Sequence, residues 1–210
     1  MEAVTAAEMK MIEAKANAAG ISYIQMMENA GHGAYLEIIK KYGLKKTAVV
    51  VGKGNNGGDG YVVARYLAKE GADVAIVMAE GMPVTEDAKL NYERCLDMNI
   101  DIISGDSAEA ETAISTAELI VEAVYGSGFH GELRENVLPI FEAVNNSDAP
   151  VCALDLPGGI NADNGTAAKE AIVADTTLVF HRPKIAHTCE SAKKYFGEII
   201  LVDIGISDVV

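Results

Sequence analysis

Residues 49–67 read VVVGKGNNGGDGYVVARYL, and this stretch decides the fold class. A short β-branched run, Thr47–Val51, enters a block of five glycines, two asparagines and one aspartate. A helix-like pattern leaves the block from Asp59 to Glu70 and ends at Gly71. A short apolar strand that runs through glycines into a helix is typical of α/β proteins with a parallel sheet.

The same alternation continues along the chain. Capping-box patterns at Thr5–Glu8 and Ser22–Gln25 predict two N-terminal helices within 5–41, before an α/β core at 47–206. Further strands are expected at 74–78, 100–103, 119–124, 151–154, 176–180 and 198–202, and further helices at 85–98, 108–116 and 133–146. We therefore expect one α/β domain over 1–210, with helices covering both faces of a mostly parallel sheet.

The strands after Gly165 have no obvious helix between them. Parallel neighbours need a long crossover connection, which is usually a helix, whereas antiparallel neighbours do not. We therefore expect the C-terminal end of the sheet to be antiparallel.

Charge and cysteine content exclude several classes of function. The 17 basic and 31 acidic residues give a net charge of −14, which disfavours nucleic acid and anionic membranes as partners. The three cysteines are far apart without a C-x-x-C pair, so we expect reduced thiols in a cytoplasmic protein. The N-terminus lacks the pattern of a signal peptide, and no apolar run reaches the roughly 18 residues of a membrane span.

The glycine block allows three interpretations. Gly52–Gly57 fits G-x-G-x-x-G, and Glu80 follows where a dinucleotide-binding protein places its ribose-binding acid. Against this, Gly58-Asp59-Gly60 puts two more glycines at the helix start, and each costs about 1 kcal/mol in a helix. They indicate a backbone kept open for another polar small molecule at the helix N-terminus. The remaining interpretation is a plain turn capped by Asp59.

Two more polar, glycine-rich blocks, 126–131 and 155–165, also follow expected strands. The carboxyl ends of parallel strands meet at one edge of the sheet, so these blocks and 52–60 should gather there. The Gly-x-Gly loop Gly126–Gly128 can offer backbone N–H groups to an anion, and His130 can face the same ligand. The four histidines have no metal-ligand spacing, so the other three are expected to be structural or exposed.

Three charged residues stand out near these blocks. Glu122 lies inside an apolar strand, where a carboxylate needs a partner or a cation unless it faces solvent at a sheet edge. Asp155 ends its strand and can act as a general acid or base, or cap the turn at Pro157. Lys184 follows the strand at 176–180 and can pair with a phosphate, pair with Asp155, or lie in solvent.

Together, these motifs resemble the YjeF N-terminal domain family, the NAD(P)H-hydrate epimerases. The resemblance extends from Thr5 to Ile206, and the string Asn-Asn-Gly-Gly-Asp-Gly is its most specific part. The matching motifs are Met26–Gly31, Gly52–Gly60, Gly126–Gly128, Asp155–Pro157, Asp163–Gly165, Lys184, Gly197 and Asp203–Ile206.

The resemblance implies a Rossmann-like three-layer α/β/α sandwich, usually a homodimer. Family members interconvert the R and S epimers of hydrated NADH and NADPH, called NADHX and NADPHX, in the repair of damaged cofactors. A partner dehydratase, dependent on ADP or ATP, acts on the S epimer and in many bacteria is fused to the C-terminus. Because the chain ends soon after Ile206, we expect either the epimerase unit without a dehydratase domain or a fragment of a longer protein.

The resemblance also implies roles for individual residues. It assigns Asp155 to the reacting ring, as the catalytic residue, and potassium to Asn56, Glu122 and Gly158. The family pattern has Asp at position 122 and Ser at position 158, so this chain departs from it twice. The residues implied in binding the hydrated cofactor are Asn55, Asn56, Gly57, Gly58, Asp59, Gly126, Ser127, Gly128, Phe129, His130, Gly131, Glu132 and Lys184.

Our hypothesis for the chemistry is that Asp155, as a carboxylic acid, protonates the leaving hydroxyl at C6 of the hydrate. The ring nitrogen then expels water, which returns to either face. Two alternatives remain open at this point. The same fold serves as a binding and dimerisation module in RNA-decapping factors. A G-x-G-x-x-G also fits an NAD-dependent oxidoreductase, although neither Tyr61 nor Tyr66 begins the Tyr-x-x-x-Lys pattern of one.

Overall fold

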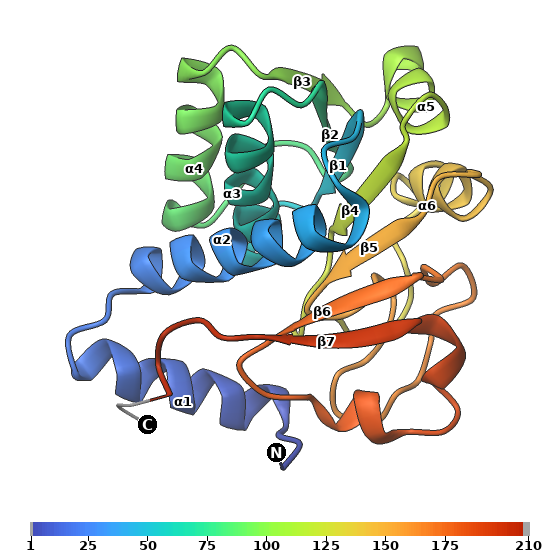
Figure 1. The fold of residues 1–210 in the computed structure, drawn as a ribbon. Helices are drawn as coiled ribbons and strands as arrows, with labels where there is room; N and C mark the ends of the chain where they lie inside the picture. The colour runs from blue at the N-terminus through green and yellow to red at the C-terminus, as the bar shows by residue number, and fades with distance from the viewer. Residues whose placement is uncertain (1, 208–210) are drawn as a thin grey trace.

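The structure, a computed structural model, describes residues 2–207. Figure 1 shows a sheet covered by helices, with a further helix, α1, below the sheet. The helices are α1 (Ala6–Ala18), α2 (Tyr23–Tyr42), α3 (Asn55–Lys69), α4 (Glu86–Asp97), α5 (Ala108–Ser115) and α6 (Leu138–Asn145), with 3₁₀ turns η1 (Ile185–Thr188) and η2 (Lys193–Tyr195). The strands are β1 (Thr47–Val51), β2 (Val74–Met78), β3 (Asp101–Ser104), β4 (Leu119–Ala123), β5 (Val151–Leu154), β6 (Thr176–Phe180) and β7 (Glu198–Val202).

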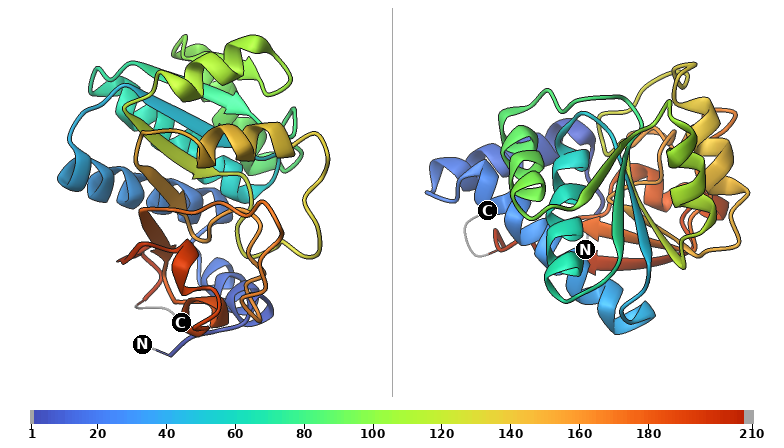
Figure 2. Two further views of the ribbon diagram at one scale, coloured as in Figure 1. Left: turned by 90° about the vertical axis from the view of Figure 1, so that its right-hand side faces the viewer. Right: turned by 90° about the horizontal axis from the view of Figure 1, so that it is seen from above.

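The seven strands form one sheet in the order β3-β2-β1-β4-β5-β6-β7. One apolar cluster joins it to α2 and α3, and a second joins its other face to α5 and α6, which gives three layers (Figures 1 and 2). The predicted Rossmann-like three-layer fold is confirmed. The chain order reverses direction across the sheet between β1 and β4, which is where open α/β sheets hold ligands.

Every neighbouring pair in the sheet is parallel, including β5 with β6 and β6 with β7. The expectation of an antiparallel C-terminal end is therefore wrong. The connections 155–175 and 181–197 are irregular but long enough to return the chain to the starting edge. A crossover needs length, and a regular helix is only its commonest form.

Helix α3 begins at Asn55, four residues before the predicted start at Asp59. A Cβ atom at Gly57 would lie 2.0 Å from the carbonyl oxygen of Gly52, and one at Gly60 would lie 2.8 Å from Val51 Cγ1 and Ala123 Cβ. These glycines let the first turns of α3 lie directly on β1 and β4. Gly57 and Gly58 are therefore helical, and the expectation that these glycines keep the backbone open for a ligand is wrong, because they form the close-packed start of the helix.

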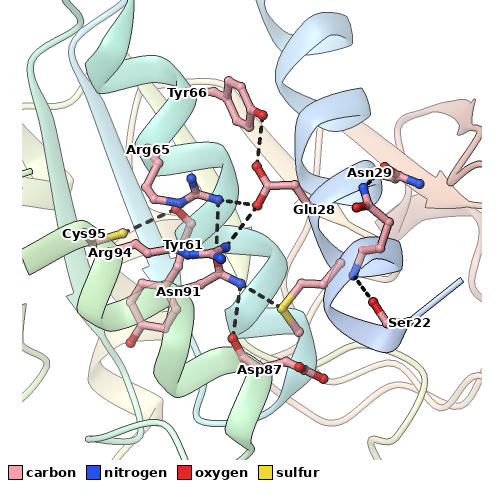
Figure 3. Close-up of polar contacts among 12 residues, drawn as sticks. Ser22, Glu28, Asn29, Tyr61, Arg65, Tyr66, Asp87, Asn91, Arg94 and Cys95 are labelled. Carbon is pink, nitrogen blue, oxygen red and sulfur yellow. Dashed lines mark hydrogen bonds and ion pairs between the residues drawn. The ribbon is translucent and has the colours of Figure 1, made fainter. Parts of the chain in front are cut away.

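A polar cluster fastens α2, α3 and α4 together (Figure 3). Glu28 of α2 pairs with Arg65 of α3 at 2.5 Å, and Arg65 donates to Asn91 of α4 at 3.1 Å. Asn91 also donates to the sulfur of Met27 at 3.2 Å. The side chain of Met27 covers Gly58, where a Cβ would lie 2.5 Å from its terminal methyl carbon. The cluster therefore fixes the position of the first turn of α3.

The helix boundaries follow local signals. Thr5 and Glu8 form the predicted capping box at α1, whereas at α2 only the Ser22 side chain caps, through the N–H of Gln25. Helix α6 starts at Leu138 rather than 133, with Pro139 in its first turn, where the missing N–H costs nothing. None of the helices in the described part of the chain combines the length and apolar character needed to cross a bilayer.

Candidate functional site

A cavity of about 450 Å³ opens at the carboxyl ends of the strands. It brings together the three blocks that the sequence predicts to meet there, and α1 contributes Glu13 and Lys10 to its wall. The predicted residues that line it are Asn55, Asn56, Asp59, Gly126, Ser127, Gly128, Phe129, Asp155 and Lys184.

Five of the residues predicted to bind the cofactor lie outside this lining. Gly57 and Gly58 are buried in the packing of α3, so they shape the site without facing it. His130, Gly131 and Glu132 are exposed beyond the Gly-x-Gly loop, and His130 hydrogen-bonds Asn161 at 2.9 Å. Direct contact of these three with a ligand in the cavity would need the loop to move.

Asp155 and Lys184 form a buried ion pair beside the cavity. Lys184 is 1% exposed and Asp155 is 7% exposed. Asp155 Oδ1 accepts from the Lys184 ammonium and from the N–H of Phe180, and Lys184 also donates to the Phe180 carbonyl at 3.0 Å. Of the alternatives for Lys184, pairing with Asp155 is confirmed and a solvated lysine is wrong. Asp155 Oδ1 therefore has two donors, and the buried Lys184 ammonium has its counterion.

His187 supports this pair from behind. Its Nδ1 accepts from the N–H of Lys184 at 2.9 Å, so Nε2 carries the proton and donates to the Asp155 carbonyl at 3.1 Å. Burial lowers the pKa of His187 to about 4, so the imidazole is neutral at pH 7. The sequence indicated a structural or exposed histidine at position 187. Nothing in it signals the contact with Asp155, because 32 positions separate the two residues.

Asp59 lies in the second turn of α3 and faces the same cavity. Within residues 2–207 its carboxyl group has neither a hydrogen bond nor an ion pair. Burial raises its pKa well above the ordinary value, and the negative charges of Asp155 and Glu13 raise it further, against a smaller opposite effect of Lys184. Asp59 is therefore the carboxyl group of the cavity that favours the neutral form.

The N-terminus of α3 offers backbone donors to the cavity. Its N-cap is Gly54, which provides no side-chain hydrogen bond, and Gly54, Lys53 and Asn55 all line the cavity. Free N–H groups at a helix start bind anions, with a lysine beside them in this case. The arrangement suits a phosphate or pyrophosphate group.

Glu80 lies at the rim of the cavity. One of its oxygens accepts from the Tyr125 hydroxyl at 3.0 Å and from Arg134 at 2.9 Å. The sequence suggested Glu80 as a ribose-binding acid but had no signal for Tyr125 and Arg134. These two residues come from the loop after β4, whose path sequence periodicity does not determine.

Glu122 is fully buried in β4. Its two carboxylate oxygens accept from the N–H groups of Val124 and Gly158, both at 2.8 Å, and burial raises its pKa to about 7. The alternative of an edge-facing, solvated Glu122 is wrong. A Cβ at Gly158 would lie 2.9 Å from Glu122 Oε1 and 2.6 Å from Phe141 Cζ. The longer acid therefore fills the space that a side chain at 158 would need.

The family model described as "YjeF-related protein N-terminus" matches residues 23–186. The chain belongs to this family. Among curated relatives, the NAD(P)H-hydrate epimerase of Pirellula staleyi is 36% identical over 89% of this chain and 85% of its own length. The bifunctional NAD(P)H-hydrate repair enzyme Nnr of Pyrobaculum aerophilum is 35% identical over 98% of this chain. The chain spans only 42% of that relative's length.

The fold of this YjeF N-terminal domain also matches a solved structure. The crystal structure of yeast ynu0 superposes with a TM-score of 0.82 at 22% identity, over 96% of this chain and 87% of the yeast chain. At that identity the match supports the fold alone.

In this YjeF N-terminal domain the two departures from the family pattern compensate each other sterically. Glu122 reaches one methylene further than Asp, and Gly158 leaves room for it. Gly158 donates its N–H to Glu122, and its carbonyl accepts from the N–H of Ile172 at 2.9 Å. Gly158 therefore offers no side-chain oxygen, and its carbonyl keeps one lone pair beyond the bond from Ile172. The Asn56 amide nitrogen is buried without a partner among residues 2–207.

Proposed function

We propose that the chain is an NAD(P)H-hydrate epimerase that interconverts the R and S epimers of NADHX and NADPHX. The observation that carries the proposal is the cavity itself. It combines a helix N-terminus suited to pyrophosphate with two carboxyl groups in unlike surroundings, Asp155 paired with Lys184 and Asp59 without an ion pair within residues 2–207. Relatives that carry this activity in their names span nearly the whole chain.

The proposed reaction needs an acid and little else. C6 of the hydrate carries both a ring nitrogen and a hydroxyl group. When the hydroxyl is protonated, the nitrogen lone pair expels water and leaves a flat C=N⁺ centre. Water then adds to either face and returns its proton. A carboxyl group at the ring and a site that keeps the ring in place are sufficient, and the cavity offers both.

A binding or dimerisation module is the weaker candidate. Burying a lysine and a carboxylate costs more desolvation free energy than an apolar pair of similar size. A module without chemistry has no need for the Asp155–Lys184 pair at the base of a cavity. The pair therefore favours the enzyme.

The proposal includes a potassium ion, held by fewer side chains than the resemblance implies. Turning the Asn56 amide by half a turn would put its oxygen where the unpaired nitrogen lies, and a bound cation would satisfy it. Asn56 and Glu122 would hold the ion through side-chain oxygens, whereas Gly158 could offer only its carbonyl, which already accepts one hydrogen bond. The ion would neutralise Glu122. A higher melting temperature in potassium than in N-methylglucamine chloride, lost in Glu122→Gln, would support this site; equal melting in both salts would remove it.

A homodimer, implied by the resemblance, and a cytoplasmic setting, expected from the cysteine content, complete the proposal. The resemblance adds a dehydratase that consumes the S epimer. Exposed apolar side chains on the two N-terminal helices, Met11, Tyr23 and Leu36, offer a surface for a second copy. Sedimentation velocity would distinguish the 22.2 kDa monomer from a dimer of twice that mass.

The function is tested with mixed R and S NADHX and a dehydratase specific for the S epimer. Without an epimerase, about half of the hydrate returns quickly to NADH and the rest returns slowly. We expect the protein to remove the slow phase. A slow phase that is unchanged at every protein concentration would refute the proposal.

A further inference from the structure

The cavity holds two aspartates in opposite states. Asp155 shares one oxygen with the buried Lys184 ammonium and the N–H of Phe180. Asp59 faces the same space with no hydrogen bond or ion pair from any residue in the described range 2–207. A proton on Asp155 would leave the Lys184 charge buried without its counterion, whereas a proton on Asp59 removes an unpaired buried charge.

We propose that Asp59, rather than Asp155, is the acid that protonates the C6 hydroxyl of the hydrate, and that Asp155 remains a carboxylate throughout. This inference rests on the proposed epimerase function and assigns its proton donor. It replaces the sequence-based hypothesis that Asp155 donates the proton. It also gives the aspartate of the Asn-Asn-Gly-Gly-Asp-Gly motif a chemical role beyond ligand contact.

The proton and charge balance is complete without a co-reactant. Asp59 gives its proton to the hydroxyl oxygen, the C6–O bond breaks, and the nitrogen lone pair forms the C=N⁺ bond. One neutral acid and one neutral hydrate become a carboxylate, a ring cation and water. Water then adds to C6 from either face and its proton returns to Asp59. The Asp155–Lys184 pair remains neutral as a unit, so it neither takes nor supplies the proton.

The charged groups around Asp59 agree with this assignment. Glu13 and Lys10 approach from α1, Asp155 from the end of β5, and Lys184 from the loop after β6. Asp87 of α4 shares a smaller adjoining cavity with Asp59. Lys184 is already bound to Asp155. Lys10 and Lys53 also line the cavity, but neither forms an ion pair with Asp59 within residues 2–207. Burial and the two nearest carboxylates both raise its pKa.

Glu13 is the competing acid, because burial also raises its pKa and it lines the same cavity. It lies on α1, and the neighbouring Lys10 and Lys184 act in the opposite direction on its pKa. Asp59 lies instead on α3, in the motif whose N-terminal backbone would hold the cofactor phosphates. It is therefore better placed for a fixed distance to the nicotinamide ring.

The first test replaces Asp59 with Asn, which keeps the shape and removes the acid. We expect Asp59→Asn to lower the epimerisation rate by roughly 10²-fold or more, with NADHX binding by equilibrium dialysis retained. Asp87→Asn is the matched control, a neighbouring aspartate outside the main cavity, and should keep the wild-type rate. A wild-type rate in Asp59→Asn would overturn the inference.

The second test does not depend on activity, so it separates this inference from the proposed function. Infrared difference spectra between neutral and alkaline pH detect the C=O band of a protonated carboxyl group. Glu122, with a pKa of about 7, and Glu13 contribute bands in the same pH range, so Glu122→Gln and Glu13→Gln spectra identify theirs. We expect one further band, present in wild type and Asp155→Asn, to be lost in Asp59→Asn. A band that persists in Asp59→Asn and vanishes in Asp155→Asn would return the proton to Asp155. If wild type lacks epimerase activity, the spectra still decide which aspartate is protonated.

The third test uses pH. The rate should fall as pH rises through the pKa of Asp59, because the acid must be protonated. Glu13→Gln removes a negative charge that raises this pKa, so the alkaline limb should move to lower pH. Two results together would contradict the assignment of Asp59 as the acid. They are an alkaline limb at the same pH in Glu13→Gln as in wild type, and the loss of that limb in Asp155→Asn.

Discussion

Asp155 adopts a left-handed backbone conformation, with φ of 62°, that only a few side chains tolerate. Asp and Asn are among them, since their short polar side chains bond locally. Two hydrogen bonds hold this conformation. His187 donates to the Asp155 carbonyl, and the Lys184 ammonium donates to the Asp155 carboxylate. The residue is thus placed by three elements, β5, β6 and η1, which no local sequence pattern connects.

Asp155→Asn tests the ion pair by itself, because Asn keeps the left-handed backbone. The variant leaves the Lys184 ammonium buried without its counterion, so the free energy of unfolding should fall by about 3–5 kcal/mol at pH 7. Urea unfolding measures it. Adding Lys184→Met should recover most of the loss. A loss below about 1 kcal/mol, or no recovery in the double variant, would mean that the pair is not buried as described.

His187 should make stability depend on pH. Its pKa is lowered from 6.5 to about 4 in the folded chain, so the unfolded chain binds the proton first as pH falls. The contribution of His187 is therefore complete above pH 6.5 and is lost between about pH 6.5 and 4, by at most about 3 kcal/mol. Urea unfolding of wild type and His187→Gln across this range measures it. Parallel pH curves for the two proteins would contradict the prediction.

At the scale of elements, the start of α3 explains where sequence analysis failed. Glycine propensity argues against a helix over Asn55–Gly60, at about 1 kcal/mol per glycine. Close packing on β1 and β4 outweighs that cost, because larger residues there would meet backbone or strand side chains within 3 Å. Propensity is visible in the sequence, whereas the distance between α3 and the sheet is not.

Gly57→Ala should therefore destabilise the protein by about 1–3 kcal/mol or more, since its Cβ would meet the backbone of Gly52. Gly54→Ala is the control. It is the N-cap of the same helix, with open space around the added methyl, and should cost less than about 1 kcal/mol. Urea midpoints of the two variants make the comparison. Equal midpoints would show that packing does not explain this glycine.

The residues of the site likewise divide into those that the sequence predicts and those that it does not. Asn55, Asp59, Gly126 and Asp155 were predictable because each follows a strand end, and all strand ends of a parallel sheet share one edge. Glu13 and His187 were not, because α1 reaches the cavity, and η1 reaches Asp155, only through tertiary contacts. The N-terminal segment joins that wall at Val4, whose N–H donates to the Pro183 carbonyl at 2.9 Å.

At the scale of the molecule, the fold class and the position of nearly every element follow from the alternation of short apolar strands with helices. The direction of β6 and β7 did not, because their crossovers lack helical periodicity. The all-parallel sheet has a functional consequence: it brings the loop with Lys184 to the same edge as Asp155 and α3. An antiparallel end would have put that lysine on the opposite side of the molecule.

The most direct measurement starts from purified S-NADHX with no dehydratase present and follows the R epimer by chromatography. We expect the R and S epimers to reach a stable ratio quickly, at a rate proportional to the amount of protein added. Purified R-NADHX should reach the same ratio. We also expect Asp59→Asn to leave both epimers near their starting composition over the same time. Epimer ratios that change no faster with the wild-type protein than in buffer alone would contradict the account.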